Sequence, residues 1–176
     1  MAINIKMQGL DVAFASIDKK VKLFEQDIKE ELNEWANGTA LRAKQLAPTD
    51  EGHLKGAINP DYVTGKELKA SVTVAVNYAA YLEFGTKKYA AAYVSSLPSD
   101  WQTFASEFKG GGASGGFKEF VKNITEWVAR KGIEKSAAYP IALSIIRNGI
   151  KQRPYLYPAV MENNKKLVAN LKNLFK

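Results

Sequence analysis

Histidine and cysteine, on which most nucleophilic and zinc chemistry depends, are nearly missing from this chain. His53 is the only histidine, and there is no cysteine. A zinc site needs several nitrogen or sulfur ligands, and a serine or cysteine nucleophile needs a general base. His53 follows a proline turn, a context that favours an exposed loop or strand position. The residue types therefore predict no catalytic or metal site, and we expect a protein that is not an enzyme.

Carboxylates and glycines give two further patterns with possible ligand chemistry. The acids of the segment 18–34 alternate with lysines at helical spacing, which is typical of a solvated helix face. Asp50 and Glu51 form a pair in a turn, but no second acidic cluster accompanies them for a glycosidase or metal role. The glycine-rich run 110–116 lacks the Lys-Ser/Thr of a phosphate loop, so we expect a mobile loop and no cofactor.

Aromatic and basic residues suggest nucleic-acid binding as a third possibility. The net charge is +7, and the segment 151–176 holds six bases against the single acid Glu162. Aromatic rings stack on single-stranded bases, but they also pack cores and protein interfaces. Only Lys87 and Lys88 lie within the aromatic cluster at 78–93, so packing is the favoured interpretation. A basic nucleic-acid-binding accessory protein is the alternative that these residues leave open.

Composition and length restrict the class of protein. A chain of 176 residues with 46% hydrophobic and 24% charged residues is typical of one globular domain. The absence of cysteine mildly favours a reducing compartment. The segment 2–10 lacks the apolar core of a signal peptide, and no apolar run is long enough to span a bilayer, so we expect no membrane partner.

The elements that would position these residues begin with a long helix. Apolar or small residues recur every three or four positions at Val21, Phe24, Ile28, Leu32, Trp35, Thr39, Ala43 and Leu46. This stripe predicts an amphipathic helix over 18–46, with Asp18 as the N-cap and Pro48 just past the end. Gly38 costs such a helix about 1 kcal/mol relative to alanine and permits a bend. The alternation in Ala2–Met7 predicts a short strand before it.

Two strand patterns follow the helix. Leu54, Ile58 and Tyr62 share one parity, and residues 68–76 alternate apolar and polar positions. With the turn at Thr64-Gly65-Lys66 between them, the two stretches predict an antiparallel hairpin. We expect Phe24 and Trp35 to pack on the strand face that carries Val72, Val74 and Val76. A helix covering one face of a small antiparallel sheet is an α+β fold.

The remaining segments favour helices. Residues 78–84 form either helical turns closed by Gly85 or another strand, and we favour the helix; Gly85 should then hold a conformation that a β-carbon disfavours. Further helices are expected at 99–108, at 117–128 with Gly132 past the end, and at 138–147. A C-terminal helix should begin at Pro158 after an extended segment.

Three segments, in this order, resemble the tail-completion (head–tail joining, minor tail or neck) proteins of siphophages. The first is APTDEGHLK at 47–55, which resembles a turn of the form Ala-Pro-x-x-x-Gly-x-Leu-(Arg/Lys). The second is YAAYLEFGT at 78–86, which resembles the more specific motif Tyr-Ala-x-Tyr-(Val/Leu)-Glu-Phe-Gly-Thr. The third is RPYLYPA at 153–159, which resembles Pro-(Phe/Tyr)-Leu-x-Pro-Ala before a C-terminal helix. The match covers about 1–88 and 150–176, so a helical, glycine-rich insertion is expected at about 87–150 of a single domain.

The resemblance implies a structural virion protein with no turnover and no cofactor. Such proteins form a ring, expected here as a hexamer, at the neck, and are assembled in the bacterial host cytoplasm. The implied partners are further copies of the chain, a tail-tube or tail-terminator protein, and a head connector or stopper protein. DNA passes through such a ring without sequence recognition. We hypothesise that the second and third motifs supply the subunit or partner interface through Tyr78, Tyr81, Glu83, Phe84, Gly85, Thr86, Arg153, Tyr155 and Tyr157.

Overall fold

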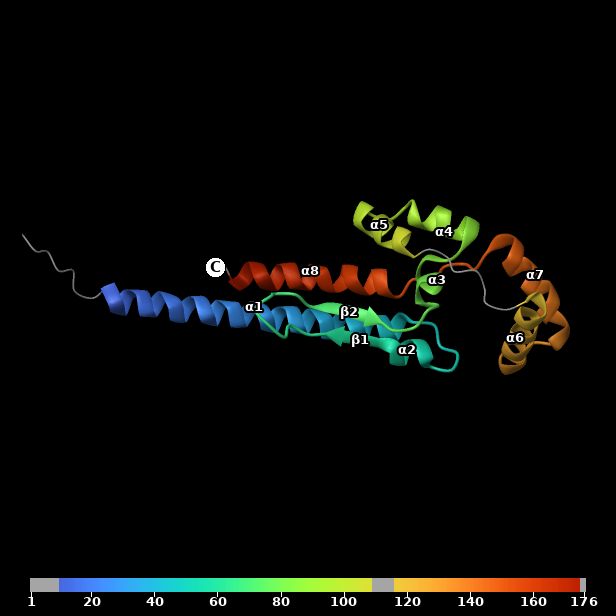
Figure 1. The fold of residues 1–176 in the computed structure, drawn as a ribbon, viewed down its shortest axis with the longest axis horizontal. Coiled ribbons are helices and arrows are strands. Elements are labelled where there is room, and N and C mark those ends of the chain that lie inside the picture. The colour runs from blue at the N-terminus through green and yellow to red at the C-terminus, as the bar shows by residue number, and fades with distance from the viewer. Residues whose placement is uncertain (1–9, 109–115, 175–176) are drawn as a thin grey trace, which may run out of the picture. The chain divides into compact units, whose positions relative to one another are not determined.

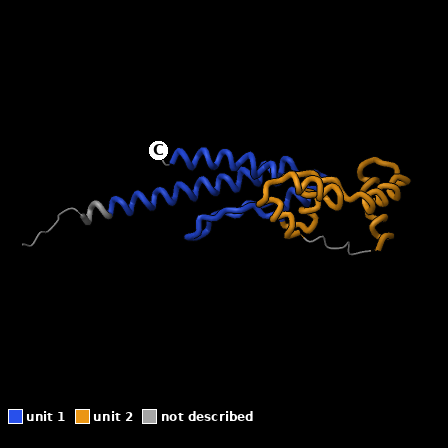
Figure 2. Tube along the Cα trace, turned by 90° about the horizontal axis from the view of Figure 1, so that it is seen from above, with its two compact units in different colours: residues 1–74, 156–176 blue, residues 75–155 orange. Residues whose placement is uncertain are grey.

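The computed structural model describes residues 10–108 and 116–174 and divides into two compact units (Figure 2). Unit 1 combines the residues up to Val74 with those from Leu156, and unit 2 is Ala75–Tyr155. The expected insertion at about 87–150 therefore falls inside unit 2. Unit 2 extends beyond the expected insertion at both ends, because it also contains the second motif and the first residues of the third.

Unit 1 is built around α1 (Leu10–Leu46), the long N-terminal helix (Figure 1). The helix ends just before Pro48, as expected, but it begins at Leu10, so Asp18 is an interior residue and not the N-cap. The reason lies in the sequence, where the spacing of three and four continues back from Val21 through Ile17 and Phe14. Nothing interrupts the helical pattern at Asp18. The strand expected at Ala2–Met7 lies outside the described residues.

The predicted hairpin is confirmed in a shorter form. Strands β1 (Ile58–Asp61) and β2 (Ser71–Val74) pair antiparallel, with Ile58 opposite Val74. Leu54, expected in the first strand, lies instead in the short helix α2 (His53–Ala57). Leu54 and Ile58 are four residues apart, a spacing that suits a helix as well as a strand, so the sequence pattern alone did not distinguish them. The α+β class holds.

Small side chains line α1 where the other elements of unit 1 approach it. Ala36 and Ala43 are fully buried, and Thr39 between them is also at 0% exposure. The side-chain oxygen of Asn33 accepts a hydrogen bond from the backbone N–H of Val63 at 2.8 Å, which ties the helix to the loop after β1. Ile58 of β1 adds a fully buried side chain to this core.

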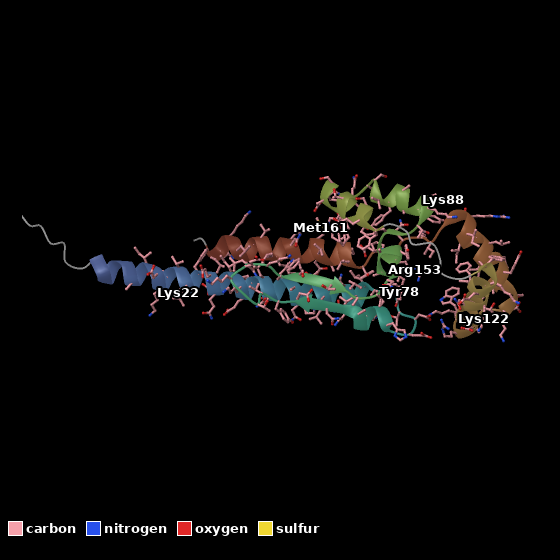
Figure 3. The ribbon with its side chains drawn as sticks, viewed as in Figure 1. Lys22, Tyr78, Lys88, Lys122, Arg153 and Met161 are labelled. Atoms are coloured by element: carbon pink, nitrogen blue, oxygen red, sulfur yellow. The ribbon has the colours of Figure 1, made fainter. Side chains whose placement is uncertain are left out.

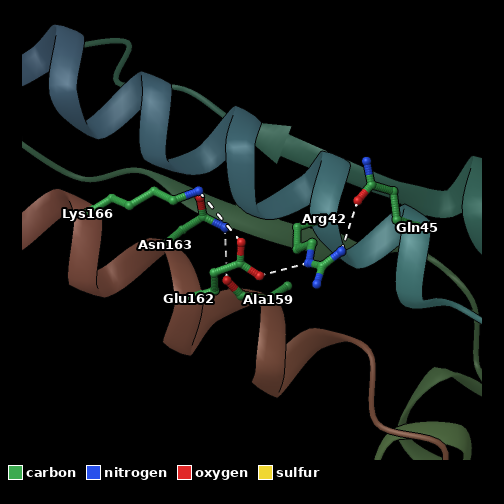
Figure 4. Close-up of polar contacts among 6 residues, drawn as sticks. All are labelled: Arg42, Gln45, Ala159, Glu162, Asn163 and Lys166. Atoms are coloured by element: carbon green, nitrogen blue, oxygen red, sulfur yellow. Dashed lines mark hydrogen bonds and ion pairs between the residues drawn. The ribbon is translucent and has the colours of Figure 1, made fainter.

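The C-terminal helix α8 (Leu156–Leu174) runs antiparallel along α1. Gly38 allows the two helices to approach closely, because a β-carbon there would lie 2.9 Å from Oδ1 of the buried Asn163. Arg42 Nε donates to Glu162 Oε2 at 2.8 Å (Figure 4), and this hydrogen bond is the main reason why the pKa of Glu162 falls below its usual value.

Trp35 of α1 contacts α8 through a hydrogen bond. Its indole N–H donates to Asn164 Oδ1 at 2.7 Å, whereas the sequence predicted that this ring packs on the strand face. A hydrophobic stripe shows which side of a helix is buried, but it does not show which element covers it. The groove beside Trp35 encloses about 160 Å³ and is lined by residues of α1 and α8 alone.

Unit 2 is helical. Its elements are α3 (Ala79–Phe84), α4 (Lys87–Val94), α5 (Ser99–Glu107), α6 (Phe117–Arg130), the 3-10 turn η1 (Lys135–Ala137) and α7 (Ala138–Asn148). The helices predicted at 78–84, 99–108, 117–128 and 138–147 are confirmed, and α4 was not predicted. Val128 of α6 and Ala142 of α7 are buried. Most of the glycine run lies at 109–115, outside the described residues.

Candidate assembly interface

The second motif folds as α3 followed by a tight turn at Gly85. Gly85 has φ +78°, a region that side chains disfavour, and its N–H bonds to Tyr81 O at 3.0 Å. A β-carbon at Gly85 would lie 2.9 Å from Ile150 O and 3.0 Å from Gln152 N. The expectation for Gly85 is therefore confirmed, and the structure adds the reason that another segment of backbone passes directly beside it.

That segment leads into the third motif. Thr86 N–H donates to Ile150 O at 2.9 Å, and Arg153 N–H donates to Leu82 O at 2.7 Å. We call this pairing of residues 82–86 with residues 150–155 the motif contact. It brings together two motifs that are separated in the sequence by most of unit 2.

A buried carboxylate completes the motif contact. Glu83 is 2% exposed, and its Oε2 accepts a hydrogen bond from the backbone N–H of Tyr155 at 2.8 Å. Tyr155 is 1% exposed. Burial, then the nearby charges of Glu83 and Tyr78, raise the pKa of the Tyr155 phenol well above its usual value. The phenol therefore stays neutral beside the buried carboxylate.

Phe84 anchors the motif contact to α5 through an aromatic cluster. Its ring centre lies 6.3 Å from Trp101, 6.1 Å from Phe104 and 6.0 Å from Phe108. Phe104 and Phe108 also meet edge to face at 5.0 Å. These distances are in the range of favourable aromatic pairs. This cluster was not predicted from the sequence, although the spacing of 101, 104 and 108 is that of a helix stripe.

The proposed interface residues fall into two groups. Glu83, Phe84, Gly85 and Tyr155 are buried, so they serve the packing of their own chain and offer no surface to a partner. This corrects the hypothesis for those four residues.

The second group keeps exposed surface. Tyr78 is 41% exposed and Arg153 is exposed (both are labelled in Figure 3). Tyr81 and Thr86 are partly exposed. Arg153 joins the motif contact through its backbone N–H, which leaves its guanidinium on the surface. Tyr157, in unit 1 at the start of α8, is partly exposed. The interface hypothesis is restricted to these five residues.

The geometry around His53 adds no support for a catalytic or metal site. His53 is exposed at the start of α2, with its Nε2 at 3.3 Å from Glu51 Oε2, which is also exposed. Within residues 10–108 and 116–174, no three His, Asp or Glu side chains are grouped as metal ligands. No helix in the same ranges combines the length and apolar character needed to cross a membrane.

Comparison with known proteins gives no relative: no family model, no curated protein and no solved structure matches the chain.

Proposed function

We propose that this chain is a structural protein of a siphophage virion, which forms a ring at the head–tail junction and joins the completed tail to the capsid connector. The observation that supports this most is the motif contact. Two of the three segments that resemble tail-completion proteins are paired by hydrogen bonds in one place. Chance matches to short motifs would have no reason to meet.

The burial of Glu83 and Tyr155 fits this proposal. A scaffold protein needs rigid geometry more than reactive groups, and a buried, hydrogen-bonded carboxylate holds the pairing in one register. The exposed Tyr78 and Arg153 lie in the same two motifs, and tyrosine and arginine are enriched at protein interfaces. The fold class alone does not establish a function, so the proposal depends on these residues.

Electron microscopy of the purified protein, alone and with tail tubes, tests the proposal. We expect rings that cap tubes, and we expect the double variant Tyr78→Ser/Arg153→Glu to stay folded but to leave tails unjoined. Tyr62→Ser is the matched control, because Tyr62 is 48% exposed but lies outside the three motifs. Failure of the wild-type protein to associate with tails would reject the head–tail role.

Nucleic-acid binding is the second candidate, since Lys165 and Lys172 of α8 are exposed. Neutralised phosphates release counterions, so a true nucleic-acid site loses affinity by several orders of magnitude between about 50 and 200 mM salt. Titration of a fluorescent DNA duplex across this salt range distinguishes the two candidates. Tight DNA binding with that salt dependence, by a protein that does not associate with tails, would favour the nucleic-acid role.

A further inference from the structure

The hydrophobic stripe of α1 is only partly covered. Its middle is buried, with Thr39 and Ala43 at 0% exposure, but at its N-terminal end Val21 is 50% and Ile17 is 54% exposed. The cause is the length of α8. Asn170 of α8 bonds to Glu31 of α1, and α8 has only one further described turn. Because the helices are antiparallel, Ile17 and Val21 lie beyond that turn.

Among the residues that the structure describes, none buries the aliphatic side chains at this end of α1, which gives it the character of a contact surface. A helical segment without a packing partner is marginal in water, and exposed aliphatic side chains add to its cost. Two exposed acids flank the aliphatic pair, because Asp18 and Glu25 lie three and four residues from Val21 and share its side of the helix. We call Ile17, Asp18, Val21 and Glu25 the α1 patch.

A second surface of matching character lies on α8. Met161 and Val168 are 37% and 50% exposed, and Lys165 and Lys172 beside them are exposed as well. The four residues follow one another at spacings of four, three and four, so they form a single stripe. The stripe faces away from α1, because Asn163, which meets α1 at Gly38, projects from the other side of α8 (Met161 is labelled in Figure 3). We call these four residues the α8 patch.

We propose that the α1 patch of one copy of this chain binds the α8 patch of a second copy. Each patch has two aliphatic side chains, and two acids on the α1 patch meet two lysines on the α8 patch. Pairing α1 with α1 would oppose acids to acids, and pairing α8 with α8 would oppose lysines to lysines. The apolar contact supplies affinity, and the charges select the partner surface.

This contact joins two different surfaces, so every subunit keeps one free patch of each kind. Such heterologous contacts close into rings or continue as filaments. The inference rests on the proposed function and deepens it, since it names the two surfaces that would join neighbouring subunits of the ring. It is tested on the purified chain without any phage component, so a failure of this pairing and a failure to join tails give different results.

Charge reversal tests the pairing. The acid-reversed variant is Asp18→Lys/Glu25→Lys, the base-reversed variant is Lys165→Glu/Lys172→Glu, and all four positions are exposed. By sedimentation velocity at low salt, we expect wild-type assemblies, at least about tenfold weaker association of each variant alone, and restored association in an equimolar mixture. Lys66→Glu/Lys69→Glu, at exposed positions before β2, is the control for net charge and should associate like the wild type.

Cysteine cross-linking gives an independent measurement, because the natural chain has no cysteine. Variants Val21→Cys and Val168→Cys should form a disulfide-linked dimer efficiently when mixed and poorly when each is oxidised alone. A cross-link that forms as well between two Val21→Cys chains would overturn the proposal. So would a monomeric wild type, a mixture of charge variants that fails to associate, or base reversal that abolishes DNA binding but leaves self-association unchanged.

Discussion

Glu83 shows how one side chain can link two distant segments. From a 2% exposed position on α3, its carboxyl oxygen accepts a hydrogen bond from the Tyr155 N–H, 72 residues further along the chain. Its neighbour Tyr155 is a buried phenol whose pKa is raised, mainly by burial. Both residues look like interface candidates in the sequence, and both are internal in the structure.

The pKa of Tyr155 leads to a prediction about alkaline stability. A raised folded-state pKa means that the unfolded chain loses the phenol proton first, so stability is complete below pH about 10 and falls above it. Between pH 8 and 11 the wild type should lose about 1 kcal/mol more of its unfolding free energy than Tyr155→Phe does. Urea denaturation at several pH values measures this.

The matched control is Tyr62→Phe, at an exposed tyrosine, which should follow the wild-type pH profile. If Tyr155→Phe and the wild type lose the same free energy above pH 10, the buried phenol has no role in the alkaline transition.

Gly85 gives a second prediction at the residue scale. Gly85→Val forces a side chain into φ +78° and against Ile150 O, and backbone strain of this kind costs about 1–3 kcal/mol before any clash. We expect a loss of at least about 2 kcal/mol in unfolding free energy, measured by chemical denaturation. Gly56→Ala is the control, because a β-carbon there meets nothing within 4 Å. Equal stability of the two variants would contradict the role assigned to the Gly85 turn.

At the scale of elements, unit 1 depends on the close contact of α1 with α8. Trp35 and Arg42 bond across it to Asn164 and Glu162, which are both exposed. Surface pairs of this kind contribute little individually, about 0–1 kcal/mol. The close approach at Gly38 is therefore the feature of this contact that a substitution should disturb most.

Gly38→Ala sets two effects against each other. Alanine favours a helix interior by about 1 kcal/mol over glycine, but the new β-carbon would lie 2.9 Å from Asn163 Oδ1. Asn163 is held by its own hydrogen bond to Ala159 O at 2.9 Å, so we expect the clash to dominate and stability to fall by about 1 kcal/mol. Thermal unfolding measures the change. In an Asn163→Ala background the sign should reverse, and a loss of the same size in both backgrounds would exclude the clash as its cause.

At the scale of the whole molecule, unit 1 is assembled from both ends of the chain. Everything from Ala75 to Tyr155 lies between them in the sequence and forms a unit of its own. Folding of unit 1 must therefore close a long loop, at an entropic cost that grows only slowly with loop length. The resemblance also covers both ends of the chain and treats much of the middle as an insertion.

Removal of residues 156–176 tests this dependence. Without α8, the α1 surface around Trp35 and Gly38 loses its cover, and an isolated helix is marginal in water. The truncated chain should lose more helical circular dichroism than the 19 residues of α8 account for. A peptide of residues 156–176 added in trans should restore part of the loss. Full retention of α1 in the truncated chain would show that α8 is dispensable.

The sequence by itself determined the local features of this protein. Apolar spacing predicted α1 and α6, capping, proline and glycine signals predicted α5 and α7, proline ended α1, and glycine closed α3, because these signals act between neighbours in the chain. Tertiary structure decided the rest. A stripe predicts burial without naming the covering element, so only the fold showed that Trp35 meets α8 and that Tyr155 is internal while Arg153 is exposed. Pairing of residues 82–86 with 150–155 depends on contacts between distant segments, and no local pattern encodes such contacts.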